Sequence, residues 1–344
     1  MDRRPTIADV AKLAGVSART VSRVINARGY VSSETRDRVL SVIRSLQYQP
    51  NPVARAMAGA PAQTIGVVIG HEPRIAFSNP FLSEVLRGIG HVASQNGYQV
   101  MLYTGESNLP YASLLATNQI GAMVFMSVPA TDPRVARVVE GGYPVVLTCR
   151  YQDSERVYTV DVDNEAGAFM AVEHLIRYGH RTIAMVTGPA NHMTTVRRVA
   201  GYRQALERYG IFFDPALVAE GDYSEESGYR LTHLLLAMRP DLSAIFAAGD
   251  LMAIGVVKAL VQNGRRVPED VSVVGFDDIS MARYLQPPLT TVRQPGFDKG
   301  AIAAEMAIQL ARGRTPQQRH VTLAPELVAR GSAAPVRVPA PAGA

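Results

Sequence analysis

The chain has 344 residues, 47% of them hydrophobic, so it can bury more than one core, and no apolar run reaches the ~18–20 residues of a membrane helix. A single cysteine excludes a disulfide framework within one chain, and the N-terminus lacks an export-signal pattern; both favour the cytoplasm. Residues 1–60 carry ten Lys and Arg against four Asp and Glu, whereas the rest carry 25 against 26, a basic footprint typical of a nucleic-acid-binding end.

The N-terminal stretch predicts two short helices joined by a tight turn. Thr6 followed by Asp9 has the spacing of a capping box, Gly15 permits the turn, and Ser17 is a suitable N-cap for the second helix. In that second helix apolar residues recur on one side, and polar residues, Arg19 among them, lie on the other. A helix pair with an arginine-bearing face has the geometry that enters the major groove of DNA.

A third helix is predicted after Ser32, and a short fourth helix follows it. Asn51 is a good N-cap for the fourth helix, Pro52 suits its first position, and Gly59 suits its end. Isolated helices shorter than ~12 residues are marginal in water. We therefore expect this helix to form only when DNA holds it; an ordinary linker is the alternative.

Four motifs in this order, ADVAKLAGVS, TVSRVIN, VSSETRDRV and YQPNPVARAM, resemble the headpiece and hinge of the lactose-repressor (LacI/GalR) family. The resemblance implies a DNA-binding headpiece at residues 1–50 and a hinge helix at residues 51–60. It also implies a homodimer whose second helices read a palindromic double-stranded operator, with paired hinge helices in the minor groove. The residues expected to contact DNA are Thr6, Ser17, Ala18, Arg19, Thr20, Ser22, Arg23, Asn26, Tyr48, Asn51, Ala54 and Met57.

The roles expected of Arg19 and Met57 can be stated more closely. By the resemblance, Arg19 reads bases, and an arginine can pair with guanine through two hydrogen bonds, which contributes ~1–3 kcal/mol of discrimination. Met57 stands where the family usually has a leucine that wedges into a base step. Methionine is apolar but flexible, so we expect it to kink DNA less rigidly.

Beyond residue 62, strand-like runs alternate with helix-like segments, which predicts an α/β fold with parallel sheets covered on both faces. About a dozen strands are more than one sheet usually contains, so we expect two lobes, each with its own sheet. The clearest strand-like runs are residues 65–69, 99–103, 122–127, 145–149, 182–187, 244–248 and 271–275, and the clearest helix-like segments are residues 81–95, 165–178, 196–209, 225–238 and 252–263.

The family resemblance continues to about residue 331 and implies a two-lobed core like that of periplasmic sugar-binding proteins over residues 62–331. The crossovers between lobes are expected near Val162, Val292 and Leu323. They would divide the core into an N-lobe of residues 62–161 and 293–322 and a C-lobe of residues 162–292 and 323–331. Residues 332–344 contain no leucine heptads and are expected to be a disordered tail, so that the dimer is the final assembly.

Ligands of such sheets bind at the carboxyl ends of the strands, here in the cleft between the lobes. By resemblance, Arg198 anchors effector hydroxyls or carboxylates, Asp277 accepts hydrogen bonds from hydroxyls, and Tyr223 lies over a sugar ring. A guanidinium, a carboxylate and an aromatic ring together suit a carbohydrate. The expected effector-binding residues are Phe77, Phe81, Cys149, Arg150, Asp163, Arg198, Tyr223, Asp250 and Asp277.

Some of these assignments have alternatives. Phe81 could equally belong to the core, and Asp163 and Asp250 could be helix N-caps. The segments SNPFLSEVLRGIG and YTGES resemble the maltose-type subgroup of the family, which makes maltose or another α-glucoside the expected effector. Cys149 stands where other members have an aspartate.

The resulting functional prediction is a sequence-specific transcriptional repressor released by a small sugar. We expect no enzyme activity, cofactor or metal, since GxxxxGK and GxSxG motifs are absent and the seven histidines lack metal-ligand spacing. The alternatives are a global carbon-catabolite regulator controlled by a phosphorylated protein partner, and a corepressor-dependent regulator or activator. A solute-binding protein would explain the lobes but would have no use for residues 1–60.

Overall fold

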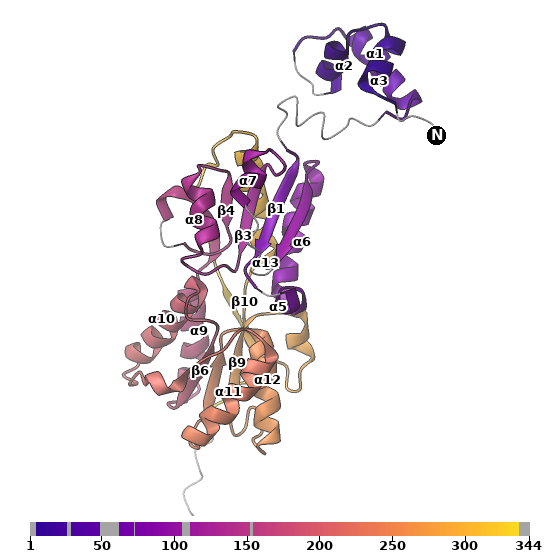
Figure 1. The fold of residues 1–344 in the computed structure, drawn as a ribbon. Coiled ribbons are helices and arrows are strands. Elements are labelled where there is room, and N and C mark those ends of the chain that lie inside the picture. The colour runs from indigo at the N-terminus through magenta and orange to yellow at the C-terminus, as the bar shows by residue number, and fades with distance from the viewer. Residues whose placement is uncertain are drawn as a thin grey trace, which may run out of the picture. The chain divides into compact units, whose positions relative to one another are not determined.

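The computed structural model describes residues 5–25, 29–48, 62–71, 73–104, 111–151 and 154–336. The chain divides into two compact units at residues 62 and 63. The first unit is helical, and the second contains two six-stranded sheets with helices on both faces (Figure 1). The α/β fold class predicted from the sequence is confirmed. None of the helices in the described ranges combines the length and apolar character needed to cross a membrane.

The first unit contains α1 (Ile7–Ala14), α2 (Ala18–Ile25) and α3 (Ser33–Ser45). The predicted capping box is present, because the Thr6 amide donates to Asp9 Oδ2 at 2.8 Å and the Asp9 amide donates to Thr6 Oγ1 at 3.4 Å. Gly15 ends α1 with a positive φ of 65°, which makes the tight turn possible. Val10, Val21 and Val39 come from the three helices and are fully buried in one small core.

The N-lobe of the second unit is built on a sheet with the strand order β11-β5-β4-β3-β1-β2, in which every pair is parallel. Side chains alternate across it: Val67 faces the core under α6 and α13, whereas Val68 faces the core under α7 and α8. Its strands are β1 (Thr64–Ile69), β2 (Gln99–Thr104), β3 (Ala122–Met126), β4 (Val145–Leu147), β5 (Tyr158–Val162) and β11 (His320–Leu323), and its helices are α5 (Pro73–Ser78), α6 (Pro80–Gln95), α7 (Tyr111–Ala116), α8 (Pro133–Glu140) and α13 (Gly296–Ala311).

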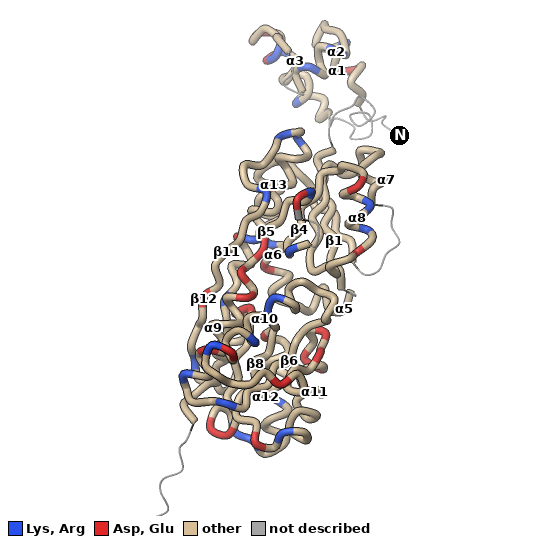
Figure 2. The backbone as a smooth tube through the Cα atoms, turned by 90° about the vertical axis from the view of Figure 1, so that its left-hand side faces the viewer, with Lys and Arg blue, Asp and Glu red and all other residues tan. Residues whose placement is uncertain are grey.

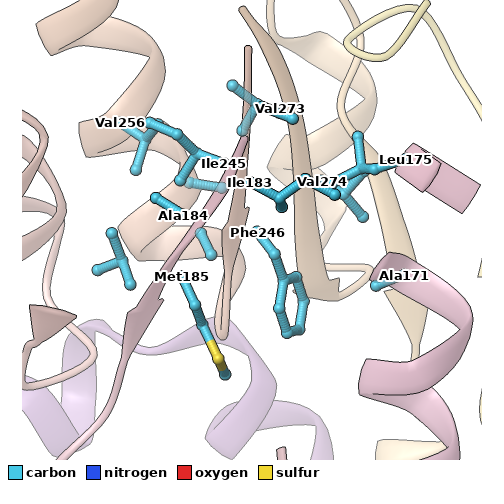
Figure 3. Packing of buried hydrophobic residues seen from close by; sticks show 14 of the residues in the cluster. Ala171, Leu175, Ile183, Ala184, Met185, Ile245, Phe246, Val256, Val273 and Val274 are labelled. Atoms are coloured by element: carbon cyan, nitrogen blue, oxygen red, sulfur yellow. The ribbon is translucent and has the colours of Figure 1, made fainter. Parts of the chain in front are cut away.

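The C-lobe has the strand order β12-β10-β9-β8-β6-β7, and only the edge strand β12 is antiparallel among the described strands. Its strands are β6 (Ile183–Thr187), β7 (Val218–Glu220), β8 (Ala244–Ala247), β9 (Ser272–Asp277), β10 (Thr290–Arg293) and β12 (Glu326–Val328), and its helices are α9 (Asn164–Arg177), α10 (Met193–Arg208), α11 (Glu225–Met238) and α12 (Asp250–Gln262). Figure 3 shows this core, with Val256 of α12 on one side of the sheet and Leu175 of α9 on the other.

The chain passes between the lobes three times: from β5 into α9, from β10 into α13, and from β11 into β12. Short 3-10 helices lie at Ser154–Arg156, Pro215–Leu217 and Ser280–Tyr284. Because each sheet is essentially parallel, the carboxyl ends of its strands form one edge. Residues that follow β1, β3, β4 and β10, together with the last residue of β9, line a single cavity.

The predicted disorder of residues 332–344 is wrong for residues 332–336. Ser332 is fully buried, its hydroxyl donates to the Val273 carbonyl at 2.6 Å, and the Thr290 amide donates to it at 2.8 Å. The Val336 amide donates to the Tyr178 carbonyl at 2.8 Å. Composition did not reveal this packing, because the stabilising partners are backbone groups of distant segments. Residues 337–344 lie outside the described part of the chain.

Candidate functional site

Helix α2 divides cleanly into a buried and an exposed side. Val21 and Val24 are buried against α1 and α3, whereas Ala18, Arg19 and Arg23 are exposed. Helix α2 carries no acidic residue, whereas α1 and α3 carry acidic residues beside their basic ones (Figure 2). This arrangement leaves a short helix with two guanidinium groups open to a polyanion.

The remaining expected DNA contacts have different surroundings. Ser17 is the N-cap of α2, because the Thr20 amide donates to its hydroxyl at 3.1 Å. Thr6 is occupied by the capping box, and Ser22 is half-buried. Tyr48 packs in the headpiece core, and burial raises its pKa. The other four positions lie outside the described residues: Asn26, Asn51, Ala54 and Met57.

The second unit contains a cavity between the ends of its two sheets. Of the nine expected effector-binding residues, five line it: Phe81, Cys149, Arg198, Tyr223 and Asp277. The other lining residues were not expected from the sequence; they are His71, Asn79, Leu82, Val85, Met126, Ser127, Thr148, Thr194, Gln294 and Lys299.

Arg198 on α10 is held rigidly at this cavity. Its Nε donates to Asn164 Oδ1 at 2.9 Å and its Nη1 donates to the Ala248 carbonyl at 2.6 Å. The guanidinium carbon lies 3.7 Å from the centroid of the Phe276 ring, which adds a cation–π contact. A buried guanidinium with two fixed hydrogen bonds is already oriented for a ligand.

Asp277 ends β9 and faces the same cavity with a positive φ of 131°. Gln294 Nε2 donates to its Oδ1. Burial raises the pKa of Asp277, and the nearby Arg198 guanidinium opposes that increase. The carboxyl group therefore accepts hydrogen bonds most readily above the mildly acid range.

The Tyr223 ring forms part of the cavity wall because the chain leaves room for it. A Cβ at Gly188 would lie 2.0 Å from Tyr223 Cζ, so only glycine allows the ring to approach this closely. The Tyr223 hydroxyl is 2.9 Å from Thr195 Oγ1, and its ring meets the His71 ring edge-on at 6.2 Å.

The structure places the other four expected residues away from the cavity. Phe77 is 63% exposed on α5, and Arg150 and Asp163 border a separate hollow. Asp163 caps α9 by accepting from the Ala166 amide at 3.0 Å. Asp250 is fully buried behind Asp277, but its carboxylate accepts from Thr291 Oγ1 and the Ile279 amide, so it is neither a lining residue nor an N-cap. Burial, and then repulsion from Asp277, raise its pKa.

Several lining residues that the sequence analysis missed had a weak signal. Ser127 and Thr148 directly follow strands, and polar residues at such positions often face a ligand. Ser127 Oγ is 2.9 Å from His71 Nε2. Lys299 is the one charged residue among the buried residues of α13, which are otherwise glycine, alanine, methionine and isoleucine, and this exception to the pattern was the available clue.

Comparisons with known proteins agree with this two-part organisation. Residues 6–51 match the model of "Bacterial regulatory proteins, lacI family", and residues 172–333 match that of a "Periplasmic binding protein-like domain". The chain is 38% identical to the HTH-type transcriptional regulator CelR of Thermobifida fusca, over 96% of this chain and 98% of that protein. It is 36% identical to catabolite control protein A of Priestia megaterium, over 92% of this chain and 96% of that protein.

Solved structures show the same relationship. The structure of a transcriptional regulator CelR–cellobiose complex is 36% identical in sequence to this chain and has a TM-score of 0.76. The match covers 96% of this chain and 100% of that chain. The structure of the lac repressor dimer bound to operator and the anti-inducer ONPF is 30% identical in sequence and has a TM-score of 0.82. The match again covers 96% of this chain and 100% of that chain. The relatives are named as regulators, in agreement with the prediction that the chain is not an enzyme. The chain therefore belongs to the LacI family of bacterial transcriptional regulators.

Proposed function

We propose that the protein binds a palindromic operator as a homodimer in the cytoplasm and releases it when a small carbohydrate fills the cavity. The exposed Arg19 and Arg23 of α2, above a buried apolar side, support major-groove binding. The solved lac repressor relative is a dimer on its operator. In the same proposal Asn51, Ala54 and Met57 contact the minor groove.

Self-association is supported by the exposed edge of the N-lobe sheet. β2 is the last strand of that sheet, and its consecutive residues Val100, Met101 and Leu102 are all exposed. An unpaired edge strand is a template for pairing, and clustered apolar residues seldom stay in water. A second copy of the chain is the partner that we propose for this edge.

One observation carries the carbohydrate assignment: Arg198, Asp277 and Tyr223 come from three different elements of the C-lobe and meet in one cavity with the N-lobe. The cavity encloses about 50 Å³, too little for a disaccharide, so binding requires the lobes or the side chains to move. The expected α-glucoside receives no support. Cellobiose, found in the solved CelR relative, is the better first probe.

No feature among the described residues favours control by a phosphorylated protein partner over control by a small molecule. The discriminating experiment measures thermal unfolding of the purified protein with cellobiose, maltose, glucose and ribose. A sugar present at one hundred times its dissociation constant stabilises the protein by ~2.7 kcal/mol.

The Arg198→Met variant keeps the aliphatic stem of the side chain. We expect that the sugar no longer stabilises this variant against thermal unfolding. Operator binding, followed by fluorescence anisotropy, is expected to weaken when the stabilising sugar is added to the wild-type protein. A wild-type protein that binds operator but responds to no sugar, or an Arg198→Met variant that responds normally, would contradict the proposal.

A further inference from the structure

Lys299 is a buried charged residue that has no part in the proposed grip of Arg198, Asp277 and Tyr223 on the ligand. It lies on α13, lines the cavity, and is 5% exposed. Among the described lining residues it is the only lysine, arginine or carboxylate that the N-lobe contributes, whereas the C-lobe contributes Arg198 and Asp277. The cavity therefore has an ammonium group on one wall, and a guanidinium group and a carboxyl group on the other.

The partner of Lys299 is Asp161 at the end of β5, with Nζ 3.2 Å from Oδ1 and the aspartate 4% exposed. Asp161 also accepts hydrogen bonds from three neutral groups, the backbone amides of Arg150 and Val162 and the Asn164 side chain, so Lys299 is one of several donors to it. An ammonium group has three donors, and Asp161 is the acceptor that the structure shows for Lys299 within the described ranges. Lys299 Nζ also lies 5.8 Å from the centroid of the Phe81 ring, another lining residue, and the donors that Asp161 does not use can bind an acceptor in the cavity.

The two cations of the cavity are connected behind it. Lys299 bonds to Asp161, Asn164 Nδ2 donates to Asp161 Oδ1 at 3.2 Å, and Arg198 Nε donates to Asn164 Oδ1 at 2.9 Å. This chain of hydrogen bonds follows the crossover from β5 to α9, so it fixes one cation on each side of the cleft.

The charges around the cavity balance. Asp161 offsets Lys299, and Asp277 offsets Arg198. An anionic ligand would find no excess positive charge, whereas a neutral ligand with several hydroxyls would find donors on both walls. This balance favours a neutral sugar over a sugar acid or a sugar phosphate.

We propose that Lys299 is a specificity-determining residue that donates to a hydroxyl at one end of a neutral sugar, while Arg198 and Asp277 hold the other end. The sugar then joins the lobes, and a ligand that lacks the hydroxyl reaches one wall only. This inference rests on the proposed function of the cavity.

The test uses the full-length protein and replaces both members of the buried pair, in the variant Lys299→Met with Asp161→Asn, because either partner left alone would be an unpaired buried charge. Calorimetric titration with cellobiose, or with maltose if only maltose binds, is expected to give a dissociation constant about 10–100-fold weaker than in the wild type. Lys258→Met, which replaces an exposed lysine on α12, is the matched control and is expected to bind normally.

A second measurement distinguishes the loss of one hydrogen bond to the sugar from a general loosening of the core. Singly deoxygenated analogues of the sugar are titrated into the wild type and the double variant. The removal of one particular hydroxyl is expected to weaken binding to the wild type, but not to weaken binding to the variant further. Unaltered operator affinity without sugar shows that the variant is folded.

The outcomes separate the two proposals. If the wild type binds a sugar, Arg198→Met loses it, and the double variant binds within twofold of the wild type, Lys299 has only a structural role and the inference fails alone. It also fails alone if every deoxygenated analogue loses affinity equally in both proteins. If the wild type binds operator and no sugar, the proposed function and the inference fail together.

Discussion

At the scale of single residues, two histidines from opposite lobes meet beside the cavity. His71 follows β1 and His192 precedes α10, and their rings stack with centroids 5.6 Å apart and planes 17° apart. Burial lowers the pKa of His71, while Asp222 opposes that shift. Burial, and then the proximity of His71, lower the pKa of His192 to about 4. Both rings are therefore neutral at pH 7.

His192 makes the folded protein sensitive to acid. Between pH ~6.5 and ~4 the unfolded state binds a proton at this residue and the folded state does not, so stability falls as the pH falls. Asp250 and Asp277 act with the opposite sign in the mildly acid range, because their pKa values are raised. The useful quantity is therefore the difference between the wild type and His192→Gln.

We expect urea unfolding to show the wild type losing about 1–3 kcal/mol relative to His192→Gln between pH 7 and pH 4. His91→Gln, which replaces a histidine on the exposed side of α6, is the matched control substitution. A constant difference between the wild type and His192→Gln across this range would show that His192 does not carry the effect.

At the scale of the elements, glycines set the distance between paired helices. In the pair α6 and α13, a Cβ at Gly88 would lie 2.1 Å from the Phe297 carbonyl oxygen, and one at Gly300 would lie 1.9 Å from the Val85 carbonyl oxygen. The pair α11 and α12 is built in the same way, since a Cβ at Gly255 would lie 2.0 Å from the Glu225 carbonyl oxygen. A backbone atom cannot rotate away as the end of a long side chain can. A side chain at any of these glycines would therefore force the paired helices apart.

Gly300→Ala is therefore expected to destabilise the protein by about 1–3 kcal/mol or more, because the helices must move apart. Gly90→Ala, in the same helix pair, is the matched control: its Cβ would meet nothing within 4 Å, and alanine favours the helix by ~0.5–1 kcal/mol. Chemical unfolding measures both. Equal effects of the two substitutions would rule out a role of close packing at Gly300.

At the scale of the whole molecule, the proposed DNA-binding and sugar-binding sites lie in different compact units with separate cores. Coupling between two sites is reciprocal, so a sugar that weakens operator binding by some factor must itself bind more weakly, by the same factor, in the operator complex. This requirement tests the proposed release mechanism without knowledge of its pathway.

We expect the sugar to bind the full-length protein about 5–150-fold more weakly when saturating operator is present, which is the usual range of allosteric coupling. A fragment of residues 63–344 is expected to bind the sugar equally well with and without operator. Both affinities are measured by calorimetry. An operator that leaves sugar affinity in the full-length protein unchanged would exclude the proposed release.

The sequence by itself was sufficient for features that depend on neighbouring residues. The capping box at Thr6 and Asp9, the turn at Gly15 and the alternation of strands with helices are local patterns, and the structure contains each of them. The order of the headpiece motifs was enough to identify the family. Spacing along the chain determines these features, so no knowledge of distant contacts was needed.

Only the tertiary structure decided which strand-end residues meet. Lys299 and Asp161 are 138 positions apart, and their pairing depends on how α13 packs against β3, β4 and β5. Asp250 was assigned to the cavity because it follows a strand, but Thr291 and the Ile279 amide turn its carboxylate inward. Ser332 was assigned to a disordered tail, but the backbone of Val273 and Thr290 holds it. In each case the direction of a side chain is set by partners that are distant in the sequence, and no local pattern encodes them.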